Sequence, residues 1–290
     1  MSKLTNENIV APNHPNPEAN NIKHLYKYYS FNKEHPEYLD DIFLNKKLYH
    51  SLPKDLNDPF EAKPKFRVPN GAKENQLYRK HIRKILKSKN PKNLSTKEID
   101  KLVSDIMANP KRKVAVIYSA FLTSYSESRV CCFTTANDNL LMWSHYANSH
   151  TGLCIGFNAK NSPFYVTYKV SYEDDKYPII KFPIKEASIF DPLLNKAKCW
   201  VYEEEYRSIM PLIIKNHSEY DGVSYFLEKD DITDIYLGIS ISKSDKDRLQ
   251  ALIKKSIFSP RIWQATTNYN SYSIKFIPLD HEFNVIESGE

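Results

Sequence analysis

The segment that decides the fold is Trp200-Val201-Tyr202-Glu203-Glu204-Glu205-Tyr206-Arg207. Its aromatic and β-branched residues, followed directly by the apolar run SIMPLII, predict a β-strand despite three consecutive acidic residues. Alternation along a strand would place Glu203, Glu205 and Arg207 on one otherwise apolar face. Ionisable groups are costly to bury unless they are paired or used. Two interpretations follow, a solvated sheet face with a Glu–Arg pair and a cleft carboxylate with an arginine partner.

The sequence on both sides of this segment mixes short strands with helices. From residue 129 onward, short β-rich runs recur as VCCFTT, GLCIGF, FYVTYKVSY, DIYLGISI and YSIKFIPL. Helical spacing predicts helices over residues 139–147 and 243–256. Near the N-terminus, we expect a strand over residues 24–31, a helix over 36–45 and a short strand over 47–52. Antiparallel-looking strands with segregated helices predict an α+β protein.

The domain organisation follows from where the texture of the sequence changes. Residues 1–22 are polar and rich in Asn and Pro, which indicates a flexible N-terminal arm. We expect residues 23–280 to form a single α+β domain and residues 281–290 to form a C-terminal tail. Residues 72–128 predict a helical insertion in that domain, with a capping box formed by Ser95 and Glu98.

The composition excludes several classes of function. The six glycines are isolated, so the chain contains no glycine-rich phosphate-binding loop of the P-loop or Rossmann type. The net charge of +6 permits a nucleic acid or a nucleotide as partner without requiring one. The four cysteines show no CxxC spacing, and the adjacent pair Cys131–Cys132 in an apolar run indicates buried thiols, so we expect no disulfide scaffold. Neither a signal peptide nor a membrane span is evident, and we expect a soluble cytoplasmic protein.

A second informative stretch runs from residue 133 to residue 157. Here a strand ends at Thr134 and Thr135, Asn137 or Asp138 is placed to cap the following helix, and that helix carries Trp143, His145 and Tyr146. A helix N-terminus beside two hydroxyls can hold an anion, but the aromatic residues of the helix are more typical of core packing. His145 and His150 are five residues apart, which is poor spacing for two ligands on one helix face. We therefore predict no metal site.

A third stretch, RKHIRKILKSKNPK from Arg79 to Lys92, contains no acidic residue. Its apolar residues form a stripe at helical spacing, which would pack against the rest of the insertion. Its basic residues also recur at helical spacing and are Arg79, Lys80, Arg83, Lys84 and Lys87. Such a face either contacts the phosphates of a nucleic acid or is simply a solvated helix face.

Several motifs together resemble the bacterial family known as domain of unknown function 2971. They lie in the expected order across about residues 24–265. They are LYKY at 25–28, NDPFE at 57–61, MWSHYA at 142–147, HTG at 150–152, VSY at 170–172, WVYEEEYR at 200–207 and IYLG at 235–238. This resemblance supplies no established activity.

The order of elements is also similar, more distantly, to the ADP-ribosyltransferase fold. That resemblance implies a mostly antiparallel, split sheet and NAD as the substrate. Lys27 stands where that family has Arg or His, and Thr134 and Thr135 fall on its Ser-Thr-Ser position. Glu203-x-Glu205 falls on its Glu-x-Glu position, so Glu205 would stabilise the oxocarbenium-like transition state and Glu203 would position the acceptor.

The complete candidate site combines these residues. The catalytic candidates are Glu205, Glu203 and Arg207. The candidates for binding NAD are Lys27, Tyr28, Asn57, Thr134, Thr135, Trp143, His145 and Tyr146. Aromatic residues among them would sandwich the nicotinamide ring.

Three functional hypotheses follow from these observations. The first is an NAD-consuming ADP-ribosyltransferase-like effector of a toxin or phage-defence system, which transfers ADP-ribose to a macromolecular acceptor. The second is a non-catalytic nucleic-acid- or protein-binding module of a defence system. The third is a metal-dependent nuclease, for which Asp58, Glu61, Glu203 and Glu205 would supply the carboxylates.

Overall fold

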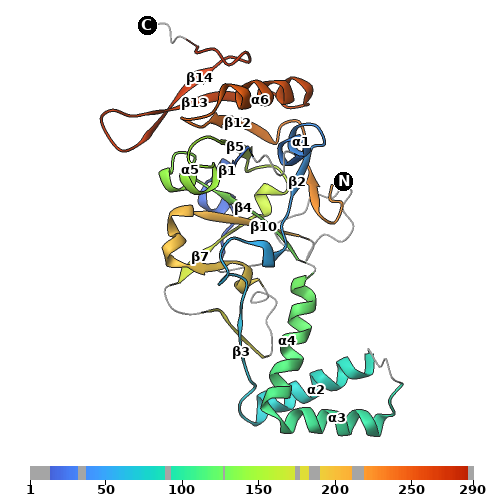
Figure 1. Cartoon of the computed structure of the whole chain (residues 1–290). Coiled ribbons are helices and arrows are strands. Elements are labelled where there is room, and N and C mark those ends of the chain that lie inside the picture. Colours follow the sequence, from blue (N-terminus) through green and yellow to red (C-terminus); the bar gives the residue numbers. More distant parts are fainter. Residues whose placement is uncertain are drawn as a thin grey trace.

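The body of the protein is an eight-stranded sheet (Figure 1). This computed structural model describes residues 14–31, 37–88, 93–126, 128–173, 177–182, 190–210 and 219–286. In order across the sheet, the strands are β14 (Ile274–Leu279), β13 (Arg261–Thr267), β12 (Ile232–Leu237), β5 (Leu153–Asn158), β1 (His24–Tyr29), β4 (Arg129–Thr134), β10 (Glu205–Met210) and β6 (Tyr168–Lys169). Neighbouring strands are antiparallel except for β12 and β13, which are parallel. The predicted α+β class is confirmed.

Smaller elements surround this sheet. Three two-stranded pairs are β2 (Lys47–Tyr49) with β11 (Ser224–Phe226), β3 (Lys65–Arg67) with β8 (Ile179–Lys181), and β7 (Ser171–Glu173) with β9 (Asn195–Ala197). The α-helices of the body are α1 (Glu37–Phe43), α5 (Leu140–Tyr146) and α6 (Lys243–Lys255). Short 3-10 helices are η2 (Glu18–Asn20), η3 (Pro53–Asp55), η4 (Phe164–Val166), η6 (Asp191–Leu193) and η7 (Lys198–Glu203).

The two faces of the sheet have different roles. On one face, α1 and α6 pack on the main core, into which β1 sends Leu25. On the other face, α5 packs on a second cluster, into which the same strand sends Tyr28. Tyr206 of β10 belongs to the main core, so its strand neighbours Glu205 and Arg207 both point to the opposite face, the α5 side of the sheet. The predicted alternation is confirmed for this part of the acid-rich segment.

The sheet opens between β1 and β4. These two strands share a single register pair, Tyr26 with Thr134, whereas β1 pairs with β5 along its whole length. At the other end of β4, Val130 instead exchanges two backbone hydrogen bonds of 2.8 Å with Ser51. The edge of β4 is therefore divided between two partners, and a notch lies between them.

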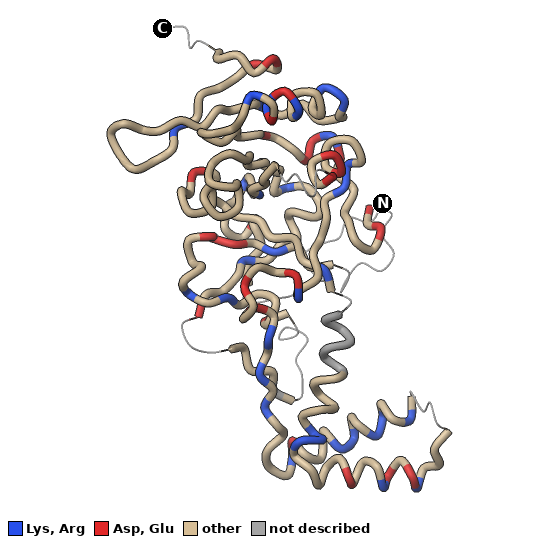
Figure 2. The backbone as a smooth tube through the Cα atoms, viewed as in Figure 1, with Lys and Arg blue, Asp and Glu red and all other residues tan. Residues whose placement is uncertain are grey.

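The described residues of the expected helical insertion form α2 (Ala72–Ser88), α3 (Thr96–Ala108) and α4 (Pro110–Ser126). It projects from one end of the body, and α2 and α3 lie at its far end (Figure 1). The capping box of Ser95 and Glu98 begins α3 as expected. The helices bury a shared apolar cluster that includes Tyr78, Ile82 and Val103. Figure 2 shows Lys and Arg residues distributed along α2.

The structure corrects several sequence-based predictions. The first half of the acid-rich segment is not a strand, because residues up to Glu203 form η7 and β10 begins only at Glu205. The residues 164–166 form η4 rather than a strand. The N-cap of α5 is Asn139, not Asn137 or Asp138, since its side chain accepts from the backbone N–H of the next turn.

The body also extends beyond both expected boundaries. His14 is buried, and the side chain of Asn20 donates to the Tyr206 hydroxyl at 2.6 Å, so residues 14–22 contact the domain. In the expected tail, Val285 bridges to Leu279. Residues 1–13 of the expected arm, 287–290 of the tail and 89–92 of the basic run lie outside the described residues. None of the described helices is both long and apolar enough to cross a membrane.

Candidate functional site

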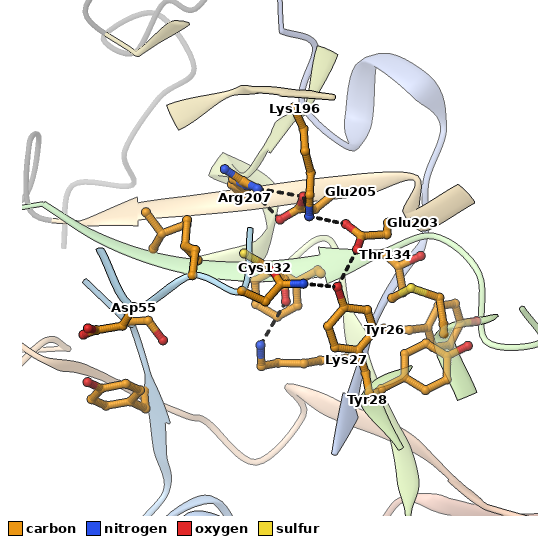
Figure 3. A pocket seen from close by; sticks show the side chains of 18 residues that line it. Tyr26, Lys27, Tyr28, Asp55, Cys132, Thr134, Lys196, Glu203, Glu205 and Arg207 are labelled. Carbon is orange, nitrogen blue, oxygen red and sulfur yellow. Dashed lines mark hydrogen bonds and ion pairs between the residues drawn. The ribbon is translucent and has the colours of Figure 1, made fainter. Parts of the chain in front are cut away.

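A pocket of about 220 Å³ lies at the notch between β1 and β4 (Figure 3). Its walls come from β1, β4, α5, the segment from Tyr49 to Asn57 and the turn at Glu203–Glu205, which we call the acidic turn. These parts are far apart in sequence and meet because the edge of β4 is left partly unpaired there. Polar and aromatic side chains from both faces of the sheet therefore gather at one opening.

Eight of the eleven predicted site residues line this pocket. Three predicted residues do not. Thr135 donates from its hydroxyl to the exposed Glu204, and the His145 ring nitrogen Nδ1 lies 3.1 Å from the Tyr202 hydroxyl at the surface. The lining residues are Lys27, Tyr28, Asn57, Thr134, Tyr146, Glu203, Glu205 and Arg207.

Trp143 supports the pocket wall instead of lining it. Its side chain is fully buried, and its ring packs edge-to-face on Tyr28 with 5.2 Å between ring centroids. The indole Nε1–H donates to the carbonyl of Asn137 at 2.8 Å. Trp143 therefore packs in the core, which is the second of the two interpretations of this residue.

Arg207 is the centre of a buried network of charges behind the pocket. It is fully buried, and its Nε and Nη2 donate to the two carboxylate oxygens of Glu205 at 2.7 and 2.8 Å. The same Nη2 donates to Glu61 Oε2 at 2.5 Å, and Nη1 donates to the carbonyl of Leu193 at 2.8 Å. Since Glu203 and Glu205 are also buried, a solvated sheet face is the wrong interpretation of this segment.

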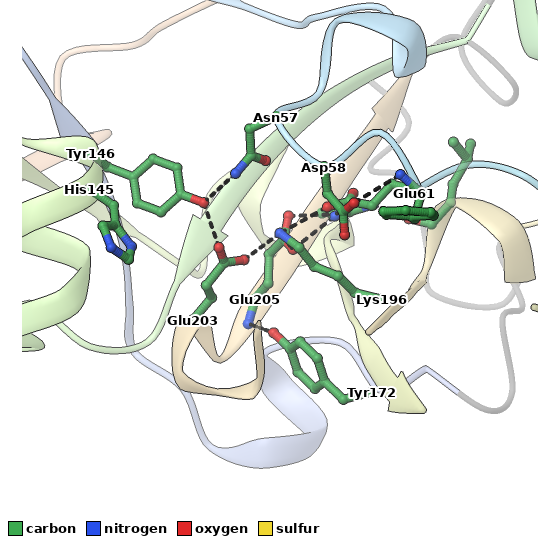
Figure 4. A network of polar contacts seen from close by, with 12 residues as sticks. Asn57, Asp58, Glu61, His145, Tyr146, Tyr172, Lys196, Glu203 and Glu205 are labelled. Carbon is green, nitrogen blue, oxygen red and sulfur yellow. Dashed lines mark hydrogen bonds and ion pairs between the residues drawn. The ribbon is translucent and has the colours of Figure 1, made fainter. Parts of the chain in front are cut away.

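Lys196 is the second cation of the network, and the sequence analysis missed it (Figure 4). Its buried Nζ lies 2.9 Å from Glu61 Oε1, 2.5 Å from Glu203 Oε2 and 3.4 Å from Glu205 Oε2. Three carboxylates thus converge on one ammonium group, at the place where the nuclease hypothesis would require a metal ion. No group of His, Cys, Asp and Glu side chains suited to a metal ion is found in the described part of the chain.

The backbone between the two acids brings their side chains together. Glu204 has φ of 45°, a left-handed conformation that is uncommon for a residue other than glycine. This turn ends η7 and starts β10, so Glu203 and Glu205 both reach the same Lys196 ammonium. The backbone N–H of Glu205 donates to the Tyr172 hydroxyl at 2.8 Å, which holds the start of the strand.

The two pocket carboxylates differ in electrostatic environment. Burial alone would raise the pKa of Glu205, but the charges of Arg207 and Lys196 outweigh it and lower this pKa to about 2. Burial and the neighbouring charge of Glu205 raise the pKa of Glu203. Glu203 is therefore the carboxylate of this pair that takes up a proton more readily.

Glu203 also has a hydrogen-bond chain that leads along the pocket wall. The Tyr146 hydroxyl donates to Glu203 Oε1 at 2.5 Å, and the Asn57 side-chain amide donates to that hydroxyl at 2.8 Å. Burial and the Glu203 charge raise the pKa of Tyr146, so its hydroxyl stays protonated and acts as a donor. The chain fixes the direction of one Glu203 oxygen while Lys196 holds the other.

The pocket has ends of opposite charge. Glu61, Glu203 and Glu205 face only two cations in the network, which leaves one negative charge in excess when all three are ionised. Across the notch, Lys27 donates from Nζ to the carbonyl of Cys132 at 3.1 Å (Figure 3). Burial raises the pKa of the Cys132 thiol, so this lining residue is not a thiolate nucleophile.

Comparison with known proteins supports one of the two resemblances. Residues 142–208, which include most of α5, Lys196 and the turn at Glu203–Glu205, match the family described as "Protein of unknown function (DUF2971)". No curated protein and no solved structure matches the chain. The similarity to the ADP-ribosyltransferase fold is therefore an expectation from the sequence, and any activity has to be argued from the site.

Proposed function

We propose that this protein cleaves the bond between nicotinamide and ribose in NAD and transfers ADP-ribose to a macromolecular acceptor. The observation that carries the proposal is the buried charge network. Its three carboxylates share two ion-paired cations, and burial and the charge of Glu205 raise the pKa of Glu203, which lines the pocket wall. A fixed carboxylate beside a small aromatic pocket suits a reaction whose transition state is cationic.

In this reaction the C1′–N bond breaks and nicotinamide leaves with the bonding electron pair. The ribose then has oxocarbenium character, and the nucleophile of the acceptor attacks C1′ and loses its proton. Glu203 would stabilise the cation and take up that proton, because Tyr146 and Lys196 already orient its two oxygens. Glu205 accepts three hydrogen bonds from Arg207 and Lys196, and its lowered pKa makes it the poorer proton acceptor, so it is better suited to positioning Glu203 than to reacting.

The remaining pocket residues suit the two ends of such a substrate. Tyr26, Tyr28 and Tyr146 offer aromatic surface near Glu203, which is appropriate for a flat ring. The Lys27 ammonium at the opposite side of the notch is appropriate for the pyrophosphate. The opening of the sheet between β1 and β4 supports the expected split in the sheet.

The biological setting is part of the same proposal. An enzyme that consumes NAD in the cytoplasm or modifies a macromolecule there would act as an effector, as in a toxin or phage-defence system. The non-catalytic binding module is the competing function. It uses the same pocket or the same charged surfaces without turnover, so an activity measurement separates the two.

The test is to incubate the purified protein with NAD and to measure free nicotinamide and ADP-ribose by chromatography. We expect release by the wild-type protein and a roughly 10²–10³-fold lower rate for Glu203→Gln. Glu204→Gln is the matched control, because it removes the adjacent exposed carboxylate and should retain the rate. Absence of nicotinamide release in water and with protein or nucleic-acid acceptors, or a fully active Glu203→Gln, would refute the proposal.

A further inference from the structure

The positive charge of this protein is concentrated in the insertion, residues 72–128. This part holds thirteen Lys and Arg residues and five Asp and Glu residues, a net charge of +8. The whole chain has a net charge of +6, so the rest of the chain carries −2. A surplus of this size in one projecting element indicates a polyanionic partner.

The basic residues of α2 form two rows on its exposed surface. Residues three and four apart are neighbours on a helix, which makes one row of Arg79 and Arg83 and another of Lys80, Lys84 and Lys87. All five side chains are exposed. Like charges at this spacing repel and destabilise a helix, and a bound polyanion would relieve that repulsion. The spacing of roughly 5–6 Å between such neighbours suits contact with successive phosphates.

Neighbouring helices leave most of this charge available. Arg83 pairs with Asp100 of α3 at 2.8 Å, and Arg79 donates to Ser104 of the same helix. Across the described ranges, no ion pair involves the row of Lys80, Lys84 and Lys87. An exposed pair such as Arg83–Asp100 is weak and screened by salt, so it does not prevent contact with phosphate.

The start of α4 adds further charge beside α2. Lys111 and Arg112 are exposed there. Lys113 donates from Nζ to the Asn75 side chain at 2.9 Å, and Tyr78 donates to the Lys113 carbonyl at 2.8 Å. These contacts fix the basic first turn of α4 against α2.

The apolar side of the insertion distinguishes a nucleic acid from a lipid surface. Helices that lie on membranes insert a large apolar face between the lipids. In α2 that face is formed by Tyr78 and Ile82, which are buried against α3 and α4. Of the large apolar residues of α2, only Leu77 is exposed, so the exposed surface offers charge with a single leucine rather than a continuous apolar face, as is typical of phosphate-backbone contacts.

We propose that the insertion is a nucleic-acid-binding arm that contacts the phosphate backbone through Arg79, Lys80, Arg83, Lys84 and Lys87. Contacts to phosphates carry no direct base information, so binding is independent of sequence. This inference does not rest on NAD chemistry, because it concerns a surface outside the pocket. If both proposals hold, the arm brings a nucleic acid to the enzyme as the macromolecular acceptor.

The test uses the full chain, labelled duplex DNA, duplex RNA and single-stranded RNA of mixed sequence, and fluorescence anisotropy without NAD. Five phosphate contacts on a duplex predict a roughly 500-fold loss of affinity between 50 and 200 mM salt. The test variant replaces the five α2 cations with Gln and should lose most of the affinity and of this salt dependence. The control variant removes the same charge elsewhere through Lys160→Gln, Lys229→Gln, Lys243→Gln, Lys254→Gln and Lys255→Gln, all exposed positions outside the insertion.

Each outcome decides the proposal. It is supported if wild type and control bind at least one of the three nucleic acids with steep salt dependence and the α2 variant does not. It is overturned if none of the three binds at 50 mM salt, or if both variants lose equal affinity. It is also overturned if anionic phosphatidylserine vesicles or polyglutamate bind the arm as tightly as every nucleic acid does. Circular dichroism of the α2 variant should show unchanged helix content, since its buried residues are retained.

Discussion

The two pocket carboxylates should respond in opposite directions when each is replaced by Gln. Glu205 has a pKa lowered by Arg207 and Lys196, so its charged form stabilises the folded protein. Glu203 has a raised pKa, so ionising it costs more free energy in the folded than in the unfolded protein. We predict that Glu205→Gln lowers the free energy of unfolding at pH 7, whereas Glu203→Gln leaves it unchanged or raises it.

The size of the Glu205 effect follows from the shift itself. Its pKa falls from 4.5 to about 2. At about 1.4 kcal/mol per pKa unit, this corresponds to a loss of roughly 3 kcal/mol for Glu205→Gln. In a chain of this size, that is roughly 5–10 °C in Tm. A charge left unpaired on Arg207 acts in the same direction.

The two contributions also have different pH dependence. The Glu205 contribution is present above the unfolded-state pKa of about 4.3 and is lost as pH falls toward the folded-state pKa of about 2. For Glu203, the relative stability of the folded state is greatest below the unfolded-state pKa and declines as pH rises through the raised folded-state pKa. Urea unfolding followed by circular dichroism at pH 7 and pH 4 measures both trends.

The reasoning would be refuted if both variants lost similar stability at pH 7. It would also fail if Glu203→Gln proved the more damaging change, because the raised pKa would then not reflect the real balance of charges. Glu204 lies between the two acids and is exposed, so the control Glu204→Gln should change the free energy of unfolding by no more than about 0.5 kcal/mol.

Three further predictions concern the surroundings of the site. Lys196→Met should lower the free energy of unfolding in urea at pH 7 by about 3–5 kcal/mol, because three carboxylates lose their shared cation. Adding Glu203→Gln should restore part of this loss. A loss below about 1 kcal/mol would contradict the prediction, as would an equal loss for the exposed control Lys198→Met. In the same urea unfolding measurement, Glu204→Ile should be about 1–2 kcal/mol less stable than Glu204→Gly, because φ is 45° at this position and a β-branched side chain is strained there. Equal stability of the two variants would show that the turn is not strained. Gly152→Ala should lower the free energy of unfolding by about 3 kcal/mol or more, because the added Cβ would lie 2.1 Å from the Tyr29 carbonyl oxygen. Gly71→Ala should lower it by only about 1 kcal/mol, because its φ is positive but no atom is close. Similar shifts in Tm for the two variants would refute the clash.

Local patterns in the sequence predicted much of the fold. The helices of the insertion, α5, α6 and the alternation of Glu205 with Arg207 all follow from periodicity within a few residues. The acidic turn was harder to predict, because the aromatic and β-branched residues of Trp200–Tyr202 favour a strand, whereas in the structure they lie in a 3-10 helix that ends before Glu205. The sequence analysis does not predict β13, although Ser259-Pro260 precedes it, because its sequence RIWQATT is polar in part.

The charge network could be predicted only in part. Glu203, Glu205 and Arg207 stand in one short motif, but Glu61 is 146 residues away from Arg207 in sequence. Lys196 has no distinctive neighbours, and only tertiary packing places its ammonium among three carboxylates. Trp143 illustrates the converse, because its conspicuous motif places it among the candidates for binding NAD while its burial shows that it packs against Tyr28.

The uneven division of charge between the insertion and the body makes the molecule an electric dipole. The insertion projects from one end of the body with +8, and the remainder of the chain carries −2 (Figure 2). In the field of any extended anion, such a dipole experiences a torque that turns the insertion forward before contact is made. The orientation of approach is thereby set at long range, and it weakens as added salt shortens the Debye length to about 8 Å at physiological ionic strength.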